Sequence, residues 1–246
     1  MQRYLAYILI AAFLVASSAA IYTVHYLIFR DAHHIFLYLV GDIAFVPVEV
    51  LLVAIVIERL LARHERHRLL HKMNMVIGTF FSELGTRLLA DMTACLENRG
   101  DVVPALAVSA RWTAADYKTA LGRAAAIDYH FRQDRLDLEV LCRTLVGNRN
   151  LLVMLLANPA LLEHEQFADL LWAVFHLMEE LEARPTLADL PASDREHLAG
   201  DVKRVYGRLA AEWLRHCRHL QKAYPYMFSI VVRTHPFQEN PSPVVV

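Results

Sequence analysis

The chain begins with two long apolar stretches that are separated by a short polar segment. The first stretch runs from Tyr4 to Phe29 and the second from Ile35 to Ile57, with the polar residues 30–34 between them. A helix rises about 1.5 Å per residue, so roughly 20 apolar residues cross the hydrocarbon core of a bilayer. Both stretches reach this length. They predict a transmembrane hairpin in residues 1–58, with spans of about 4–29 and 35–57.

The rest of the chain has a helical pattern. After residue 58, apolar residues recur at intervals of three, four and seven positions, and no stretch alternates apolar and polar residues for long enough to make a convincing strand. We therefore expect an all-α protein, with an N-terminal two-helix transmembrane hairpin and a cytoplasmic helical domain over residues 59–236 that begins with a basic juxtamembrane helix. Residues 237–246 are expected to form a disordered tail.

Three amphipathic helices are expected in this domain, each with one apolar face. Two capping boxes mark helix starts, one made by Thr113 with Asp116 and one by Ser193 with Glu196. The three apolar faces consist of Leu121, Ala124, Ile127, Phe131, Leu138, Cys142 and Leu145; of Phe167, Leu170, Val174, Met178 and Leu181; and of Leu198, Val202, Val205, Leu209, Trp213, Cys217 and Leu220.

Two shorter segments are assigned from their composition. Residues 151–157 are apolar on all sides but too short to cross a membrane, which favours a central core helix over a re-entrant or interfacial segment. The aromatic segment 224–237 is bounded by prolines. It could dock on the domain, lie at the membrane interface or meet a partner, and docking is the favoured interpretation.

Basic residues orient the predicted hairpin. Positions 58–72 are rich in Arg and Lys, whereas the hairpin turn carries only Arg30, beside Asp31. The positive-inside bias therefore places both termini in the cytoplasm and predicts a multi-pass protein of the cell inner membrane. The same segment is expected to bind anionic lipid headgroups through Arg59, Arg63, Arg66, Arg68 and Lys72.

A cleaved signal peptide is the alternative to the first span. Arg3 precedes an apolar stretch, and residues 18–20, Ser-Ala-Ala, offer small side chains for cleavage. The apolar stretch nevertheless continues to Phe29, which is the length of a span rather than of a signal sequence. A retained span is favoured, and both possibilities leave the large domain in the cytoplasm.

Composition adds that the charge is unevenly distributed. Hydrophobic residues make up 56% of the chain and charged residues 21%, and nearly all of the charge follows Ile57. The net charge of -1 hides this asymmetry and gives no sign of a nucleic-acid partner. Cys95, Cys142 and Cys217 show no CxxC spacing and are interpreted as small buried thiols in a reducing compartment.

Candidate chemistry is concentrated in the second span, where Asp42 and Glu49 lie seven residues apart. At about 100° per residue the two carboxylates project from one helix face. Intramembrane carboxylates are costly, so they indicate a functional site. Pro47 lies between them and removes a helical hydrogen bond.

Two roles are open for these carboxylates. A symmetric hairpin places Asp42 near Tyr22 and Glu49 near Ser17 and Ser18, so protonated acids could join the spans by hydrogen bonds. Alternatively, the acids conduct protons or cations. Because two spans cannot enclose a pore, conduction requires an oligomer that repeats the acids around an axis.

Several histidines have helical spacing. His64, His67 and His71 share one face, but neighbouring Arg residues and the lack of a matching Cys or carboxylate argue against a metal site. His176 with Glu179, and Asp194 with His197, are spaced i, i+3, as in helical di-metal sites. We interpret these two pairs as solvated or capping residues, because the remaining ligands of a di-metal site are missing.

The juxtamembrane segment also resembles helical HEPN ribonuclease domains. Arg59-x4-His64 and Arg66-x4-His71 each match the short Arg-x4-His signature of that family. The resemblance implies RNA cleavage by Arg and His residues that meet across a dimer cleft. In this chain both matches flank a membrane exit, which makes a membrane-tethered nuclease the distant alternative.

No further motif specifies a reaction. The sequence contains no Gly-rich phosphate loop, no nucleophile elbow and no CxxC pair. We therefore expect a non-enzymatic, membrane-anchored assembly or signalling module without a cofactor or metal. Its expected partners are the bilayer, further copies of itself and a cytoplasmic protein. An oligomeric conducting protein is the main alternative.

Overall fold

The computed structural model describes residues 2–132, 135–238 and 240–244, without the side chains of residues 2–4, 6, 66–72 and 162–163. Within these ranges the regular secondary structure is helical, and one isolated antiparallel bridge joins Leu96 to Phe131. The all-α prediction is confirmed. The chain divides into two compact units, residues 1–65 and residues 66–246, which we call the hairpin unit and the helical domain.

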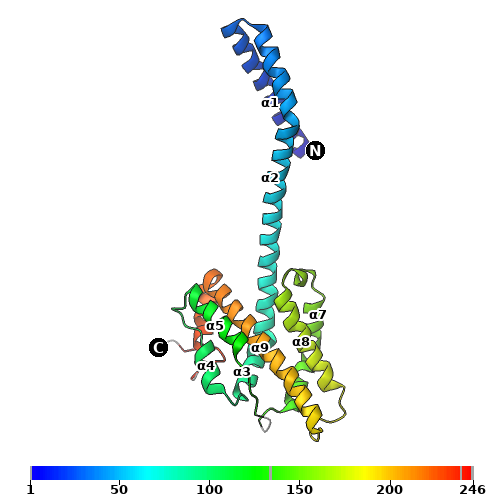
Figure 1. The fold of residues 1–246 in the computed structure, drawn as a ribbon, viewed down its shortest axis with the longest axis vertical. Coiled ribbons are helices and arrows are strands. Elements are labelled where there is room, and N and C mark those ends of the chain that lie inside the picture. The colour runs from blue at the N-terminus through cyan, green and yellow to red at the C-terminus, as the bar shows by residue number, and fades with distance from the viewer. Residues whose placement is uncertain (1, 133–134, 239, 245–246) are drawn as a thin grey trace. The chain divides into compact units, whose positions relative to one another are not determined.

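The hairpin unit reverses direction in two residues. Helix α1 (Gln2–Phe29) is followed by Arg30, whose left-handed φ of 49° turns the chain and whose N–H donates to the Tyr26 carbonyl at 2.8 Å. Asp31 then caps helix α2 (Ala32–Phe80), because its Oδ1 accepts from the His34 N–H at 3.2 Å. The tight turn lays α1 back along the first part of α2 (Figure 1).

Two helical stretches in this unit, Tyr7–Phe29 and Ala32–Glu65, are long and apolar enough to cross a membrane by length and composition. Their large apolar side chains remain exposed, as shown by Phe13 at 71%, Val15 at 70% and Val40 at 68%. The apolar surface is therefore covered only in small part within the hairpin unit itself.

Helix α2 continues without interruption beyond the predicted end of the second span. The sequence analysis placed a domain boundary after residue 58, but α2 extends to Phe80. Residues 48–77 contain neither Gly nor Pro, the strongest helix breakers, so nothing in this stretch favours an end. The basic segment 58–72 is therefore part of α2 and not a separate helix.

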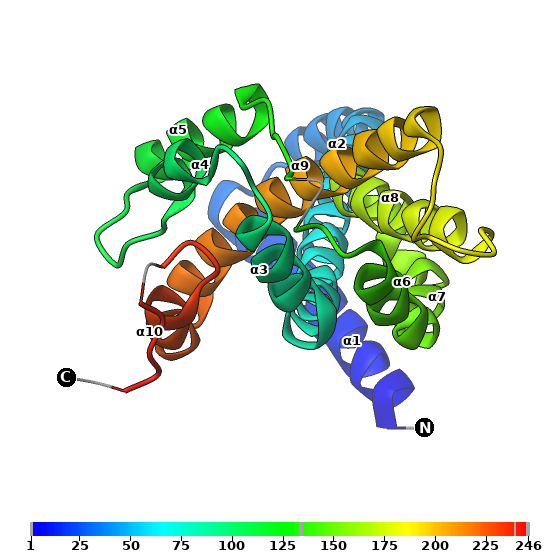
Figure 2. The ribbon, with the colours of Figure 1, turned by 90° about the horizontal axis from the view of Figure 1, so that it is seen from below.

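The helical domain is built around α9 (Ala192–Ala223). Figure 2 shows α9 crossing the domain, with α4 and α5 on one side and α6, α7 and α8 on the other. Along the chain, the end of α2 is followed by the π-helical turn Phe81–Gly85, α3 (Thr86–Ala94), α4 (Arg99–Leu106), α5 (Ala114–Ala126), α6 (Leu138–Gly147), α7 (Arg149–Leu156), a 3-10 turn (Pro159–Glu163), α8 (Glu165–Glu182), α9 and α10 (Pro225–Thr234).

The apolar periodicity correctly identified the two helices that form most of the core. All five predicted face residues of α8 are at most 1% exposed, and so are six of the seven in α9, with Leu220 at 4%. Helices α8 and α9 pack against one another, and α9 also contacts α3, α5 and α10. Burial of these faces provides the main hydrophobic stabilisation of the domain.

The predicted helix across residues 121–145 is wrong. Its first part forms α5, which begins with the predicted capping box of Thr113 and Asp116 and ends at Ala126. A loop follows, and α6 starts anew because Asp137 accepts hydrogen bonds from the N–H groups of Glu139 and Val140. Local capping and the Leu96–Phe131 bridge override the apolar periodicity in this stretch.

Three further predictions differ from the structure. The segment 151–157 forms most of α7, but it is peripheral, because Val153 is 48% exposed and Met154 59% exposed. The second capping box is absent, since α9 begins after Pro191 without a side-chain cap. The predicted tail begins too early, because Phe237 is only 1% exposed.

The aromatic segment near the C-terminus docks on the domain as predicted. It forms α10 and a short extension, and Phe228 is buried in the core. His235 and Phe237 pack against Trp213, with ring centroids 5.6 and 5.1 Å from the indole. These contacts attach His235 and Phe237 to the C-terminal half of α9.

Candidate functional site

The acidic pair of the second apolar helix is exposed on α2. Neither Asp42 nor Glu49 has a hydrogen-bond or ion-pair partner within the described part of the chain. Ser17 is partly buried, whereas Ser18 is exposed and Tyr22 is 40% exposed. The structure does not join these hydroxyls to the two carboxylates.

The basic residues that were predicted to bind lipid headgroups are described only in part. Arg59 and Arg63 are exposed on α2, one helical turn apart. The side chains of Arg66, Arg68 and Lys72 lie outside the described residues, as do those of His67 and His71. The expected headgroup site is therefore represented here by its first two arginines.

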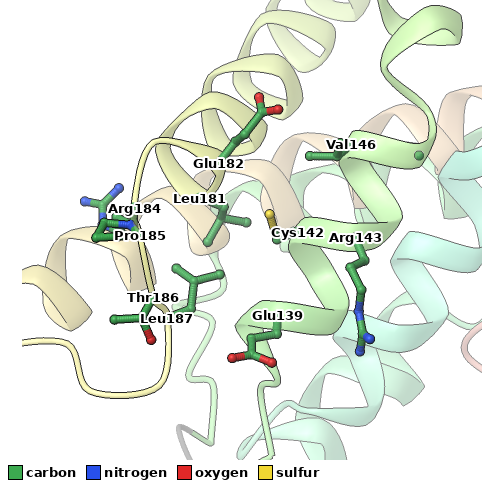
Figure 3. Close-up of a pocket in the computed structure, with 11 residues that line it drawn as sticks. Glu139, Cys142, Arg143, Val146, Leu181, Glu182, Arg184, Pro185, Thr186 and Leu187 are labelled. Atoms are coloured by element: carbon green, nitrogen blue, oxygen red, sulfur yellow. The ribbon is translucent and has the colours of Figure 1, made fainter.

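A pocket with a volume of about 630 Å³ lies between α6 and the end of α8 (Figure 3). Cys142 lies between the two helices, near Leu181, and Arg143 and Arg184 are on opposite sides of the labelled group. The remaining lining comes from Glu139, Val146, Gly147, Glu182, Pro185, Thr186 and Leu187. The lining of this pocket thus combines apolar side chains with charged side chains of both signs.

The protonation state of the Cys142 thiol limits the chemistry that this pocket can support. Burial raises the pKa of Cys142, and the Glu182 carboxylate raises it further. Burial also raises the pKa of Cys95 and of Cys217. Because the thiolate is the reactive form, these pKa shifts make all three cysteines weak nucleophiles near neutral pH.

A second pocket, of about 440 Å³, lies between α5, α8 and α9 and carries four basic side chains. Each base has an acidic partner among the described residues. The pairs are Lys203 with Asp128, Arg204 with Asp201, Arg208 with Asp169 and Arg215 with Glu212. The basic charge is therefore balanced locally and does not form a free phosphate-binding surface.

The carboxylate of Glu212 is buried in the wall of this second pocket. Its side chain is 2% exposed, and Oε1 accepts from Arg215 at 2.6 Å while Oε2 has no hydrogen-bond partner in the structure. Burial raises the pKa of Glu212, and the Arg215 charge lowers it in part. Sequence inspection missed this residue, because helical periodicity does not reveal which charged positions become buried.

The histidine–carboxylate pairs differ from those noted in the sequence. His176 approaches Glu180 rather than Glu179, and His197 approaches Asp201. Asp194 instead accepts two hydrogen bonds from Arg184, at 2.8 and 2.6 Å. The pairs within each helix are thus spaced i, i+4, where the sequence suggested i, i+3 pairs.

Together, the fold and its exposed N-terminal helices define an all-helical protein with two apolar helices long enough to span a membrane. The chain belongs to the MJ1433 family. Residues 2–61 match the family model described as "MJ1433, N-terminal helical domain", and residues 69–233 match "Uncharacterized protein MJ1433, C-terminal helical domain". The boundary between the two compact units falls between these matches.

A relative from Methanocaldococcus jannaschii shows the same family. It is the uncharacterized protein MJ1433, which is 39% identical over 240 residues, covering 97% of this chain and 95% of the relative. No solved structure matches the chain. The similarity therefore extends over both units, and the family is described by its helical domains without an activity.

Proposed function

We propose that this protein is an integral membrane protein whose hairpin anchors and assembles a non-enzymatic helical signalling module. The observation that carries the proposal is the exposed apolar surface of α1 and the first part of α2. Contiguous apolar patches on soluble proteins rarely exceed a few hundred Å². Hydrocarbon, or the hairpins of other copies, would cover this larger surface.

The proposed topology is a two-span protein of the cell inner membrane with both termini in the cytoplasm. Arg59 and Arg63 support it, because they follow the apolar part of α2 and are exposed, as headgroup contacts require. The hairpin turn, by contrast, offers one Arg beside one Asp. This asymmetry favours the basic end as the cytoplasmic side.

Cysteine labelling tests the anchor and its orientation. In a background with Cys95→Ser, Cys142→Ser and Cys217→Ala, a membrane-impermeant maleimide should label His33→Cys in intact cells. It should label Asn240→Cys only after lysis. The opposite labelling would overturn the orientation, and recovery of the unmodified full chain in the soluble fraction after cell disruption would overturn membrane insertion.

The helical domain is proposed to bind a cytoplasmic protein rather than to catalyse a reaction. The pocket between α6 and α8 supports this role, because it combines apolar side chains with charged side chains of both signs. Its thiol is kept protonated by a raised pKa, which does not favour nucleophilic catalysis. The HEPN-like alternative would require a second chain to face Arg59 and His64, which are both exposed on α2.

An oligomeric conducting protein is the second candidate function. The observation that favours it is the exposure of Asp42 and Glu49, for which the described residues supply no partner. Repeated around an axis, the two acids would form acidic rings. In the assembly module, by contrast, they would hydrogen-bond to neighbouring copies, at roughly 0.6–2 kcal/mol per bond.

Substitution of both acids separates the two candidates. With Asp42→Asn and Glu49→Gln, the assembly module should keep its oligomeric mass in native mass spectrometry, because amides still form hydrogen bonds. A conducting protein should lose or change its cation flux in proteoliposomes. Glu58→Gln is the matched control, since Glu58 lies at the end of the apolar stretch. A monomeric or dimeric mass would exclude the conducting ring.

A further inference from the structure

A third pocket, with a volume of about 240 Å³, lies in the helical domain where the end of α2 approaches α9 and α10. Asn74 and Gly78 line it from α2, His216 and His219 from α9, and Met227 from α10. All of these residues belong to the same compact unit. The pocket shares no described lining residue with the pocket between α6 and α8, so a ligand here would be separate from the partner proposed above.

Aromatic rings and sulfur atoms contribute much of the lining. The His216 ring stacks on the buried Phe81, with ring centroids 5.1 Å apart and an angle of 15° between the planes. Tyr224 packs edge-to-face on His219, with centroids 5.8 Å apart. Two thioethers also line the pocket, those of Met75 and Met227. This lining favours a flat aromatic ligand, because ring–ring and sulfur–ring contacts add to the gain from burying apolar area.

The described lining residues include no carboxylate, lysine or arginine. Burial, together with the nearby His219, lowers the pKa of His216 from 6.5 to about 4, so the His216 imidazole is neutral at pH 7. A charged ligand would lose its hydration here without gaining an opposite charge from these residues. The pocket therefore favours a neutral ligand.

Polar groups in the pocket are available to orient such a ligand. Asn74 and Ser82 both line it, and neither side chain forms a hydrogen bond or ion pair with another described residue. The amide and the hydroxyl can each donate and accept hydrogen bonds. A few polar groups among apolar ones are typical of small-molecule sites.

Gly78 leaves space on the α2 side of the pocket. Its φ is not positive, so the backbone conformation does not require glycine. A Cβ at this position would have His216 Cε1 as its nearest atom beyond its own helical turn, at 3.8 Å, which is ordinary van der Waals contact. A longer side chain would extend further into the pocket and compete with a ligand for the same space.

We propose that this pocket binds a neutral, planar molecule of one or two aromatic rings that carries a hydrogen-bonding group. A cavity of about 150 Å³ can hold benzene, so the larger volume here suits a ligand of up to two fused rings. Sites for drug-sized ligands are larger, at about 300–1,000 Å³, which sets an upper limit on the size. The rings would pack against His216 and Tyr224, and the polar group would bind Asn74 or Ser82.

A ligand in this position would contact three helices at once. Besides α9 it would touch α10, which is joined to the core through Phe228, and α2, which also carries the second predicted span. Because it would bind only the folded domain, the ligand would stabilise the packing of these helices. The inference goes beyond the anchoring role proposed above and gives the helical domain a small molecule to sense.

Titration with 5-fluoroindole, followed by ¹⁹F NMR, tests the proposal on the full-length protein in nanodiscs. Empty nanodiscs measure how much of the probe enters the lipid. The natural protein should add one saturable site per chain, with a dissociation constant of about 0.1–1 mM, as expected for a ligand of so few atoms. Gly78→Leu should weaken this binding by about tenfold or more, because its side chain would occupy the same space.

Two glycine variants separate loss of the pocket from loss of the fold. Alanine is favoured over glycine in helix interiors, so Gly78→Ala should weaken binding without lowering the melting temperature. Gly122→Leu is the matched control, because a Cβ there meets no atom within 4 Å and Gly122 does not line the pocket. Its affinity for 5-fluoroindole should equal that of the natural protein.

A size-matched pair of probes tests the preference for a neutral ligand. 4-Fluorobenzamide and 4-fluorobenzoate have nearly the same shape, but only the benzoate is charged at pH 7. The amide should bind to the natural protein, and the benzoate should bind about tenfold more weakly or less. Benzoate binding as tight as that of the amide would overturn the neutral-ligand proposal. Fluoroindole uptake no greater than in empty nanodiscs, or equal affinity in the natural protein and both Gly78 variants, would overturn the site itself.

Discussion

Gly85→Ala should destabilise the helical domain by about 2 kcal/mol or more. A Cβ on Gly85 would lie 2.6 Å from Phe80 Cε1 and 2.8 Å from Phe81 Cδ1, both well inside van der Waals contact. Neither ring can move cheaply, because Phe80 is 0% and Phe81 2% exposed, and Phe80 also packs edge-to-face on Phe167. Thermal or urea unfolding of the full chain in detergent measures the effect.

The matched control is Gly122→Ala in α5. A Cβ there meets no atom within 4 Å, and the position lies inside a helix. Alanine is favoured over glycine in helix interiors by about 1 kcal/mol, so this variant should be slightly more stable than the natural protein. The two glycine substitutions should therefore change stability in opposite directions. A neutral or stabilising Gly85→Ala would contradict the packing described here.

Gly85 also shows why part of the fold could not be predicted. It ends the π-helical turn Phe81–Gly85, in which the wider helical turn brings position 85 against the rings of Phe80 and Phe81. A glycine in a helical sequence costs stability whatever its surroundings, so the sequence alone gives no reason for its presence. Only the tertiary contacts supply one.

The hairpin and the central helices were predictable for a different reason. The length of an apolar stretch is a local property, and so is the periodicity that predicted α8 and α9. The α5–α6 break depends on the cap at Asp137 and on a bridge to Leu96, which is 35 positions away from Phe131. Contacts over such separations are not encoded in a window of one or two helical turns.

The same distinction between local patterns and long-range contacts applies to the candidate sites. Asp42 and Glu49 were found from sequence, because a carboxylate in an apolar stretch is conspicuous wherever it lies. His176 and His197 were noticed, but their shared neighbour Asp201 was missed, because the three residues lie on two helices and become neighbours only when α8 packs on α9. Reading the i, i+3 positions along each helix pointed to the wrong carboxylates.

Acid should destabilise the helical domain through its buried histidines. His235 is 2% exposed, and burial lowers its pKa from 6.5 to about 4. Nε2 lies 3.1 Å from the Val108 carbonyl, and Nδ1 accepts from the Phe237 N–H at 3.2 Å. A neutral imidazole with its proton on Nε2 fits both bonds. A second proton on Nδ1 would break the bond to Phe237.

The sign of the effect follows from which state binds protons. Below the ordinary pKa of 6.5 the unfolded chain takes up a proton at His235, whereas the folded chain does so only near pH 4. The stability contributed by the neutral imidazole is therefore complete above about pH 6.5 and is lost toward about pH 4. Between about pH 7.5 and about pH 5, His235 should account for a loss of about 2 kcal/mol.

Other titrating groups in the domain must be separated from this effect. Burial also lowers the pKa of His216 to about 4, which adds to the loss in acid. Glu212 acts in the opposite direction, because burial raises its pKa and its contribution to stability falls as the pH rises. Both contributions cancel when a His235 variant is compared with the natural protein at each pH.

His235→Gln provides this comparison. Glutamine cannot titrate, so the free energy of unfolding of the variant should fall less in acid than that of the natural protein, and their difference should shrink by about 2 kcal/mol between about pH 7.5 and about pH 5. Tryptophan fluorescence can follow unfolding, since Trp213 packs on His235. His130→Gln, at an exposed histidine, should change stability by no more than about 0.5 kcal/mol at neutral pH. If the difference in unfolding free energy between His235→Gln and the natural protein does not vary with pH, the buried imidazole does not have the lowered pKa, and the prediction is wrong.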